Sequence, residues 1–331
     1  MTRGFVLGKF MPPHAGHISL CRAAAQMVDQ LTILVCSQPD DAMAGVQRAA
    51  WMRELFPAAR VCHVDRRVPQ APQDSDDFWP IWRAIVREFH PEPIDLVFAG
   101  EEYGLELAEQ VGGRFVPFLR ADGDGDAEPD VYAGAGGVAR LSSTAVRADP
   151  ARYWRYLPAP VRRDEVKIVA LHGVESVGKS TLAKALAQRL DSDWVAEYGR
   201  AHCEVHGNDL VPRDLELIAA AQTAWIDAAR EWSGPVLITD TDWLMTAAWN
   251  LLLFDRPLSG PSYPLADLYL HLPPDLPWVD DGTRMFGGDA DRRRFDAICR
   301  DVLAQAGANL AVLDAPLDAR LDQALAAIGT L

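Results

Sequence analysis

The sequence has few cysteines, no long apolar run and no excess of basic residues. Its five cysteines are scattered and form no C-x-x-C pair, which argues against structural zinc and fits a reducing cytosol, so we expect a cytoplasmic protein. No apolar run approaches the roughly 20 residues of a membrane span, and the N-terminus lacks a secretory signal's charged-then-apolar layout. The formal charge of −15 argues against a nucleic-acid-binding surface. We therefore expect no membrane or nucleic-acid partner, while homo-oligomerisation stays open.

A phosphate-binding loop lies near the middle of the chain. Residues 173–181 read GVESVGKST, which fits the P-loop pattern G-x-x-x-x-G-K-[ST]. The apolar run Val166–Leu171 predicts a buried strand before it, and Thr181–Leu190 has helical spacing after it. This geometry directs backbone N–H groups at phosphates, so we expect Lys179 at the β/γ-phosphates and the Ser180 hydroxyl on Mg²⁺. The other loop residues expected at the nucleotide are Gly173, Glu175, Ser176, Gly178 and Thr181. The flanking strand and helix disfavour a plain flexible glycine turn.

The position of this loop predicts two domains, at residues 1–160 and 161–331. A chain of 331 residues has a length typical of two domains, and a P-loop strand usually opens its own. Alternating strands and helices predict an α/β fold with a parallel sheet in each domain and ligands at the carboxyl ends of the strands. The strands expected in the first domain are Leu31–Cys36, Arg60–Val64, Asp95–Ala99 and Arg114–Phe118, and the helices are Val46–Phe56, Phe78–Phe89 and Tyr103–Val111.

The chain begins with a second strand, loop and helix arrangement. Gly4–Leu7 is a short apolar strand, the following loop contains His14, Gly16 and His17, and Ile18–Met27 has helical spacing. Gly16 permits close approach of the backbone, and both histidines can present ring N–H groups to a polyphosphate. A lone histidine is usually packed or solvated, but two that flank a glycine at such a junction favour phosphate binding.

This loop resembles the mark of the nucleotidylyltransferase superfamily, His-x-Gly-His after the first strand. The second mark of that family, a Ser-Ser-Thr-x-x-Arg segment, is present at residues 141–147, which read LSSTAVR. Hydroxyls at a helix start and the Arg147 guanidinium suit phosphate oxygens. The resemblance implies a Rossmann-like domain whose ATP-binding residues include Gly8, Lys9, Phe10, Ser143 and Thr144.

In the second half, Trp194–Glu197 and Val236–Thr239 read as strands. The first ends in Glu197, and Asp240 and Asp242 follow the second. We expect Asp240 to hold Mg²⁺ and Asp242 to face a substrate hydroxyl, with capping of the next helix as the alternative for both. Residues 280–294, which include Arg284 and Arg292–Arg294, predict a basic lid over the phosphates. Arg292–Arg294 fit the solvated face of a final helix equally well, so Arg284 is the preferred lid residue.

Both halves together resemble one bifunctional family, which joins nicotinamide-mononucleotide adenylyltransferase to ribosylnicotinamide kinase. The resemblance implies that the second domain phosphorylates nicotinamide riboside with ATP and that the first converts the mononucleotide and ATP to NAD and pyrophosphate. Some members carry a DNA-binding helix-turn-helix segment ahead of the first domain. Met1 stands three residues before the first strand here, so we expect no repressor function.

The two reactions require different residues. Adenylyl transfer needs no protein base because the nucleophile is already a phosphate anion, so Lys9, His14, His17 and Arg147 are expected to position the reactants and neutralise charge. The kinase acts on a neutral hydroxyl and needs a carboxylate, for which Glu197 and Asp242 remain open. A cationic nicotinamide ring favours stacking on indole. The substrate-binding candidates are Trp79, Trp82, Trp243, Tyr198 and Arg200.

Two other readings have less support. The first domain could serve only as a sensor of NAD or its precursors, but its His14, His17 and Arg147 are all present. The P-loop domain could be a nucleotide-dependent switch, but such proteins carry a base-reading motif such as Asn-Lys-x-Asp, and the sequence has none.

Overall fold

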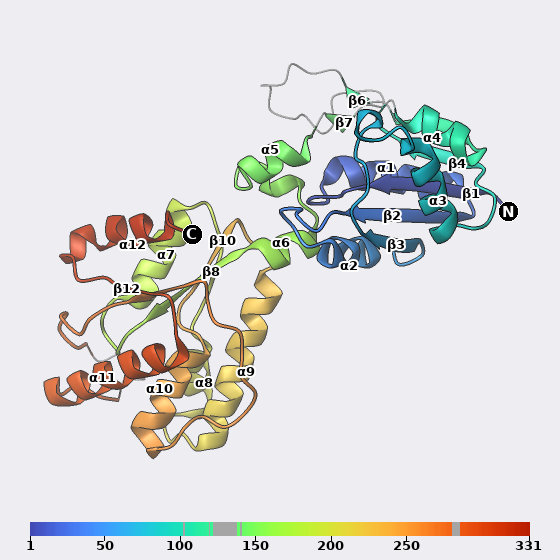
Figure 1. The fold of residues 1–331 in the computed structure, drawn as a ribbon. Helices are drawn as coiled ribbons and strands as arrows, with labels where there is room; N and C mark the ends of the chain where they lie inside the picture. The colour runs from blue at the N-terminus through green and yellow to red at the C-terminus, as the bar shows by residue number, and fades with distance from the viewer. Residues whose placement is uncertain (102, 119, 122–137, 140, 280–284) are drawn as a thin grey trace. The chain divides into compact units, whose positions relative to one another are not determined.

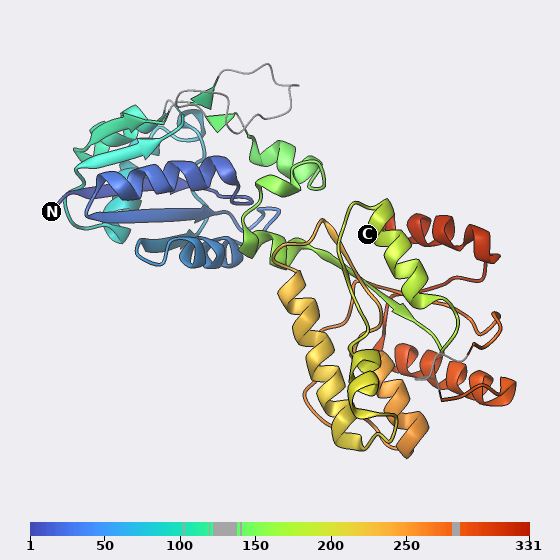
Figure 2. The ribbon, with the colours of Figure 1, turned by 180° about the vertical axis from the view of Figure 1, so that it is seen from behind.

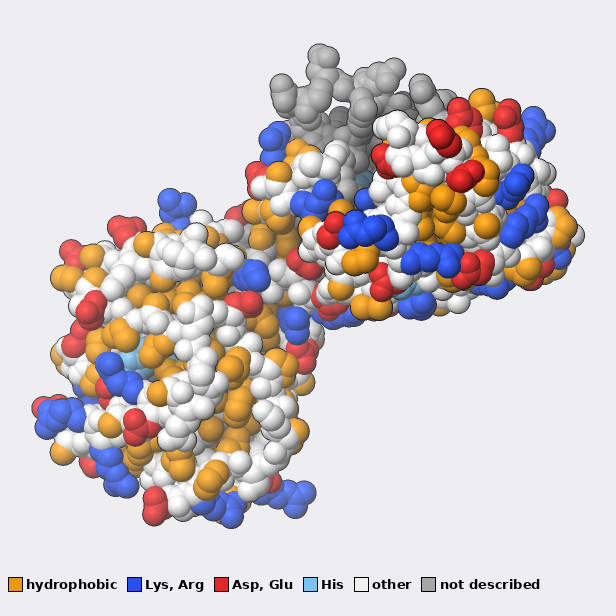
Figure 3. All heavy atoms as spheres, in the orientation of Figure 1, with side chains coloured by type: hydrophobic (Ala, Val, Ile, Leu, Met, Phe, Trp, Pro, Cys, Tyr) orange, Lys and Arg blue, Asp and Glu red, His pale blue; other side chains and the backbone are white. Residues whose placement is uncertain are grey.

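The computed structural model describes residues 1–101, 103–118, 120–121, 138–139, 141–279 and 285–331. The chain divides into two compact units, Met1–Val161 and Arg162–Leu331. Each helix in the described ranges is too short or too polar to span a lipid bilayer. Acidic and basic side chains are interspersed over the visible face of each unit (Figure 3).

The first unit is built on a five-stranded parallel sheet with the order β3-β2-β1-β4-β5 (Figure 1). Its strands are β1 (Arg3–Gly8), β2 (Gln30–Ser37), β3 (Arg60–Asp65), β4 (Leu96–Ala99) and β5 (Arg114–Pro117). Val6 of β1 is in register with Ile33 of β2 on one side and Phe98 of β4 on the other. The chain reverses its direction of winding between β1 and β4. Open α/β sheets bind ligands at the carboxyl ends of the strands at such a point.

Helices cover both faces of this sheet (Figures 1 and 2). Phe5 and Val6 are both fully buried, but successive strand residues point to opposite faces. Phe5 packs with α3 (Phe78–Phe89) and α4 (Tyr103–Val111), whereas Val6 packs with α1 (Ala15–Met27) and α2 (Gly45–Leu55). This part of the chain also contains the strand pair β6 (Arg120–Ala121) and β7 (Val138–Ala139), α5 (Ser143–Ala148), and α6 (Ala159–Glu165), which contains the boundary between the units.

The second unit has its own five-stranded parallel sheet, with the order β12-β11-β8-β10-β9. Its strands are β8 (Lys167–His172), β9 (Trp194–Val195), β10 (Val236–Thr239), β11 (Leu268–His271) and β12 (Leu310–Val312). Its helices are α7 (Lys179–Arg189), α8 (Tyr198–His206), α9 (Pro212–Ala229), α10 (Trp243–Phe254), α11 (Asp289–Ala306) and α12 (Arg320–Ile328). Figures 1 and 2 show α7 and α12 on one side of the sheet and α10 and α11 on the other. The central strand, β8, leads directly into the P-loop.

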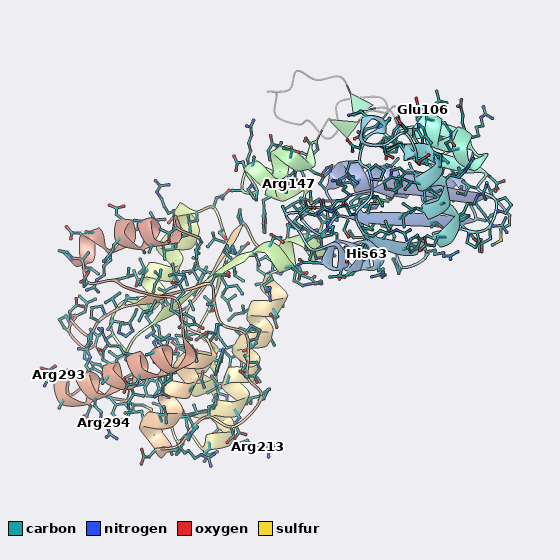
Figure 4. The ribbon with its side chains drawn as sticks, viewed as in Figure 1. His63, Glu106, Arg147, Arg213, Arg293 and Arg294 are labelled. Carbon is teal, nitrogen blue, oxygen red and sulfur yellow. The ribbon has the colours of Figure 1, made fainter. Side chains whose placement is uncertain are left out.

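The predicted fold class, two parallel-sheet α/β domains, is confirmed. One strand is shorter than predicted, because β9 ends at Val195 and α8 begins at Tyr198. The structure describes only part of the expected basic lid. Its first part, residues 280–284 with Arg284, lies outside the described residues, and Arg292–Arg294 belong to α11. Arg293 and Arg294 project outward from that helix, as the solvated-face alternative predicted (Figure 4), but Arg292, which that alternative included, is buried.

Candidate functional site

The loop between β1 and α1 places two histidine rings against each other. His14 is the residue before α1, and its ring stacks on that of His17 with the centroids 3.9 Å apart. The Phe10 ring approaches His17 edge-on at 5.0 Å between centroids. A Cβ at position 16 would lie 3.1 Å from Cε1 of His14, so glycine there leaves room for the His14 ring. The pair therefore has a fixed position at the carboxyl end of β1.

Arg147 connects the Ser-Ser-Thr segment to this loop. The Ser142 hydroxyl accepts a hydrogen bond from the Thr144 N–H at 3.2 Å and caps α5. The Arg147 guanidinium donates to the Met11 carbonyl and, at 3.3 Å, to the Thr144 hydroxyl. Figure 4 shows Arg147 on α5. The two motifs of the superfamily thus meet in space, although 136 positions separate Arg147 from Met11 in the chain.

A cavity of about 730 Å³ opens beside these residues. This volume is in the range of about 300–1,000 Å³ that is typical of small-molecule sites. The predicted site residues that line it are Gly8, Lys9, Phe10, His14, His17, Trp79, Trp82, Ser143, Thr144 and Arg147. Gly16 contributes indirectly, through the space it leaves for His14.

The two tryptophans at this cavity differ in exposure. Trp82 is 7% exposed, belongs to the core and donates its indole N–H to the Pro69 carbonyl at 3.0 Å. Trp79 is only partly buried and packs edge-on against Phe78, with 4.9 Å between centroids. Trp79 is therefore the better candidate for stacking on a ligand ring.

A buried arginine that the sequence did not reveal supports the His14 loop. Arg48 on α2 is fully buried and donates to the Lys9 carbonyl at 2.6 Å, to the Cys36 carbonyl at 3.2 Å and to the Asp41 carboxylate at 2.6 Å. Burial opposes ionisation of Asp41, but hydrogen bonds from the Gln38 N–H and Arg48 outweigh it and hold the pKa of Asp41 below its usual value. An arginine in an amphipathic helix is normally read as solvent-facing, so its role could not be found from the pattern.

The P-loop of the second unit has the backbone that its glycines predict. Gly173 has φ 136°, and a Cβ there would lie 2.5 Å from the Leu272 carbonyl oxygen. Gly178, with φ 90°, is the residue before α7. The Lys179 ammonium donates to the Gly173 and Val174 carbonyls, both at 2.9 Å. The lysine is therefore held over the loop at the N-terminus of α7, where phosphate oxygens would bind.

Two adjoining cavities surround this loop. The predicted residues that line the first cavity are Glu175, Ser176, Gly178, Lys179, Ser180, Thr181, Glu197 and Arg200. Asp240 lines the second cavity together with Ser180, Glu197 and Arg200. The structure therefore brings the P-loop, the start of α8 and the end of β10 to one place.

The two candidate carboxylates of the kinase lie in different environments. Glu197 lines both cavities, and its pKa is raised by burial and by Asp240 and Glu175, against the opposing effect of Lys179 and Arg200. Asp242 instead accepts hydrogen bonds from the Leu244 N–H at 3.0 Å and from the Tyr269 hydroxyl at 2.5 Å. Burial raises its pKa to about 6. The expectation that Asp242 faces a substrate hydroxyl does not agree with this geometry, because both oxygens are engaged in capping α10 and bonding Tyr269.

Two aromatic candidates also lie away from the cavity linings described here. The Trp243 indole N–H donates to the Pro264 carbonyl at 3.1 Å, and the Tyr198 ring packs edge-on against Trp225 at 5.0 Å between centroids. Trp249, later on α10, lines the P-loop cavity that also contains Glu175 and Lys179, and it packs against Phe295 with 4.4 Å between centroids. Met245, Thr246 and Trp249 all line this cavity, and their helical spacing is the signal that could have identified Trp249.

The segments on either side of residues 280–284 are bonded to the P-loop. The Glu175 carboxylate accepts hydrogen bonds from the Met285 N–H at 3.2 Å and the Phe286 N–H at 3.3 Å. The Ser176 hydroxyl accepts from the Val279 N–H at 3.1 Å. Arg292, which is buried, donates to the Glu175 carbonyl at 3.3 Å. Arg292 is therefore a structural support of the loop.

Comparisons with known proteins give a match for each unit. A cytidylyltransferase-like family model matches residues 5–113, and an AAA domain model matches residues 168–320. The trifunctional NAD biosynthesis/regulator protein NadR of Escherichia coli (strain K12) is 28% identical over 333 residues, which cover 92% of this chain and 77% of that protein. The chain is thus similar to NadR proteins over most of its length.

Solved structures of NadR proteins share the fold of the whole chain. One, in complex with NR, has a TM-score of 0.69 and 22% identity, and the match covers 99% of this chain and 95% of that chain. Another, in complex with NAD and AMP-PNP, has a TM-score of 0.68 and 21% identity over the same shares. These structures thus share the two-unit α/β fold described above.

Proposed function

We propose that this chain makes NAD from nicotinamide riboside in two ATP-dependent steps. The second unit phosphorylates the riboside to nicotinamide mononucleotide, and the first adenylylates the mononucleotide to NAD and releases pyrophosphate. The observation that carries this proposal is that each unit has its own phosphate-binding loop, which opens onto its own cavity. The name of the E. coli relative and the ligands NR, NAD and AMP-PNP in the NadR structures support it.

Adenylyl transfer in the first unit depends on positioning. The 5′-phosphate oxygen of the mononucleotide attacks the α-phosphorus of ATP, a new P–O–P bond forms, and the bond to pyrophosphate breaks. The attacking group is already an anion, so no side chain has to remove a proton. His14, His17, Lys9 and Arg147 line the cavity and supply the N–H donors and positive charge for the phosphate oxygens.

Phosphoryl transfer in the second unit requires removal of one proton. The 5′-hydroxyl oxygen of the riboside attacks the γ-phosphorus of ATP, ADP leaves, and the hydroxyl proton passes to a carboxylate. We assign this role to Glu197, because it lines the P-loop cavity and its pKa is raised, whereas Asp242 caps a helix. Lys179 at the N-terminus of α7 neutralises phosphate charge, and Arg200 lines the same cavity.

The residues at the end of β10 fit a magnesium ion. Asp240 is 2% exposed, and within the part of the chain that the structure describes its Oδ1 atom is buried without a hydrogen-bond partner. Asp240 shares a cavity with Ser180, so these two oxygens would hold the ion. The described residues contain no cluster of three or more His, Cys, Asp or Glu side chains suited to a metal, and Mg²⁺ typically takes only one or two protein ligands and completes its shell with phosphates and water. When bound, the ion neutralises charge on the transferring phosphates.

The test of this proposal supplies the purified chain with nicotinamide riboside, ATP and Mg²⁺, and measures NAD and ADP. Both products should form. Glu197→Gln should lower riboside phosphorylation by about 10²–10⁴-fold, since it removes a general base, and should leave adenylylation of added mononucleotide intact. Glu204→Gln changes an exposed residue of α8, the helix that begins directly after Glu197, and serves as the control. Wild-type protein that makes neither mononucleotide nor NAD would contradict the proposed function.

A further inference from the structure

Gln222 is a polar side chain on the buried face of α9. Its neighbours on that face are apolar, among them Ile218 and Ile226, and the glutamine is only 1% exposed. A buried amide is costly unless its donors and acceptor are all used. The Gln222 carbonyl oxygen accepts a hydrogen bond from the Tyr198 N–H at 2.7 Å, and its amide nitrogen donates to the Ala196 carbonyl at 3.2 Å.

The same amide nitrogen also reaches the end of β10. It lies 3.2 Å from the Thr239 hydroxyl oxygen and 3.5 Å from the Thr241 carbonyl oxygen. The Thr239 hydroxyl donates to that Thr241 carbonyl at 2.6 Å. One side chain therefore bonds both residues that flank Glu197 and both residues that flank Asp240.

The turn after β10 has an unfavourable backbone conformation. Thr241 has φ 80°, in the left-handed region that a β-branched residue rarely adopts. Such strain persists where surrounding contacts fix it. The turn at Thr241 directs the two acids to different places. Asp240 lines the cavity with Ser180, whereas Asp242 caps α10 and accepts a hydrogen bond from the Tyr269 hydroxyl.

We propose that Gln222 is a positioning residue for phosphoryl transfer, which sets the spacing between Glu197 and the Asp240 carboxylate by bonding the start of α8 to the strained turn at Thr241. This inference rests on the kinase function proposed above. Gln222 acts through the backbone of its neighbours, because its amide groups are already committed to them. Loss of the amide lets the two carboxylates move relative to the P-loop, and a misplacement of about 1 Å can cost about 10²-fold in rate.

The primary test replaces Gln222 by methionine, which has a similar length and makes no such hydrogen bonds. We expect kcat for riboside phosphorylation to fall by about 10–100-fold and the Mg²⁺ concentration for half-maximal rate to rise several-fold. Gln323→Met is the matched control. Gln323 accepts from the Ala315 N–H at 3.1 Å and donates to the Val312 carbonyl at 3.2 Å in the same unit, but it does not line the P-loop cavities described here. The control should lower Tm without changing kcat or the Mg²⁺ dependence.

A second variant tests the route through Thr241. Glycine adopts positive φ without strain, so Thr241→Gly in the Gln222→Met background should restore kcat at least several-fold. The proposal is overturned if Gln222→Met retains wild-type kcat and Mg²⁺ dependence, if Gln323→Met causes the same losses, or if Thr241→Gly gives no rescue.

Failure of the kinase assignment would be seen separately. Wild-type protein that phosphorylates no riboside contradicts the proposed function, and the role of Gln222 is then measured by calorimetry with Mg²⁺ and ATP alone. Weaker Mg²⁺-dependent ATP binding in Gln222→Met than in Gln323→Met supports the positioning role, and equal binding overturns it.

Discussion

Both oxygens of the Asp242 carboxylate are engaged, one by the N-terminus of α10 and the other by Tyr269. Such contacts favour the ionised form, yet burial outweighs them and raises the pKa to about 6. The charged form of Asp242 is therefore less favourable in the folded protein than in the unfolded chain. Sequence spacing alone could not separate it from Asp240, because the difference arises from the backbone turn at Thr241.

The first prediction concerns the stability of Asp242→Asn as a function of pH. A carboxyl whose folded pKa is raised stabilises the fold fully below its usual pKa of 3.8, and this contribution is lost as pH rises through about 6. Asparagine keeps the acceptor that caps α10 but carries no charge. The free energy of unfolding of the variant, relative to that of the wild type, should therefore rise by up to about 3 kcal/mol between pH 4 and pH 8. Urea unfolding curves measure this, with the exposed Asp209→Asn as control. A difference in the free energy of unfolding that is constant with pH would contradict the raised pKa of Asp242.

Arg48 gives a second prediction at this scale. Arg48→Met leaves the Asp41 carboxylate, whose side chain is 8% exposed, with the Gln38 N–H at 3.0 Å and the Lys9 ammonium at 3.6 Å. Breaking a buried ion pair typically costs about 3–5 kcal/mol, so the free energy of unfolding of the first unit should fall by this order. Adenylylation should fall as well, because Arg48 bonds the Lys9 carbonyl of the His14 loop.

The double variant Arg48→Met with Asp41→Asn removes both charges. It should recover part of the lost stability, because no uncompensated buried charge remains. A double variant that is as unstable as the sum of the single variants would show that Arg48 acts by packing alone.

At the scale of elements, α5 consists of only six residues and depends on its cap. Ser142→Ala removes the acceptor for the Thr144 N–H and should cost about 1 kcal/mol of local stability. Fraying of so short a helix would release Arg147 from the Met11 carbonyl, so adenylylation should fall by about tenfold while riboside phosphorylation stays unchanged. Ser142→Thr keeps the hydroxyl and should behave as wild type. Amide exchange at Thr144 and kinetics of both reactions check the prediction.

Apolar runs and turn residues predicted most elements closely. The helices Phe78–Phe89 and Tyr103–Val111 and the strand Val236–Thr239 have the predicted bounds, because each is a clear apolar pattern with a polar or glycine boundary. The start of α11 was missed, since residues 289–294 are strongly charged and read as part of a lid. Its position depends on contacts between distant segments, such as Arg292 with the Glu175 carbonyl, which no local pattern contains.

In the candidate sites, residues that belong to a local motif were predicted from the sequence, but residues that act through contacts with distant segments were not. Motif residues such as His14, His17 and Lys179 were found from the sequence, because phosphate binding imposes a fixed local spacing. Arg48 and Gln222 were not identified from the sequence. Each is a single polar residue in a helix, and its partners, such as Cys36 for Arg48 and Thr239 for Gln222, lie in distant parts of the chain. Their assigned roles, like those of the motif residues, stay predictions until variants are measured.

At the scale of the whole molecule, each cavity is lined by residues of one unit alone. The two reactions should therefore fail separately. Lys179→Ala removes the cation of the P-loop and should abolish riboside phosphorylation while adenylylation of added mononucleotide persists. His17→Ala should do the reverse, with a loss of about 10²–10³-fold if the ring stabilises charge in the transition state. Separate assays of ADP from riboside and of NAD from mononucleotide measure both effects.

Mixing the two variants extends this prediction. His17→Ala protein still makes mononucleotide, and Lys179→Ala protein still converts it, so an equimolar mixture given riboside, ATP and Mg²⁺ should produce NAD that neither variant makes alone. The rate should rise with protein concentration, because the mononucleotide has to diffuse between molecules. Loss of both activities from either single change, in protein with an unchanged unfolding curve, would show that the units share one site. A mixture that makes no NAD, although each variant keeps its remaining activity, would show instead that the intermediate does not leave the chain on which it is made.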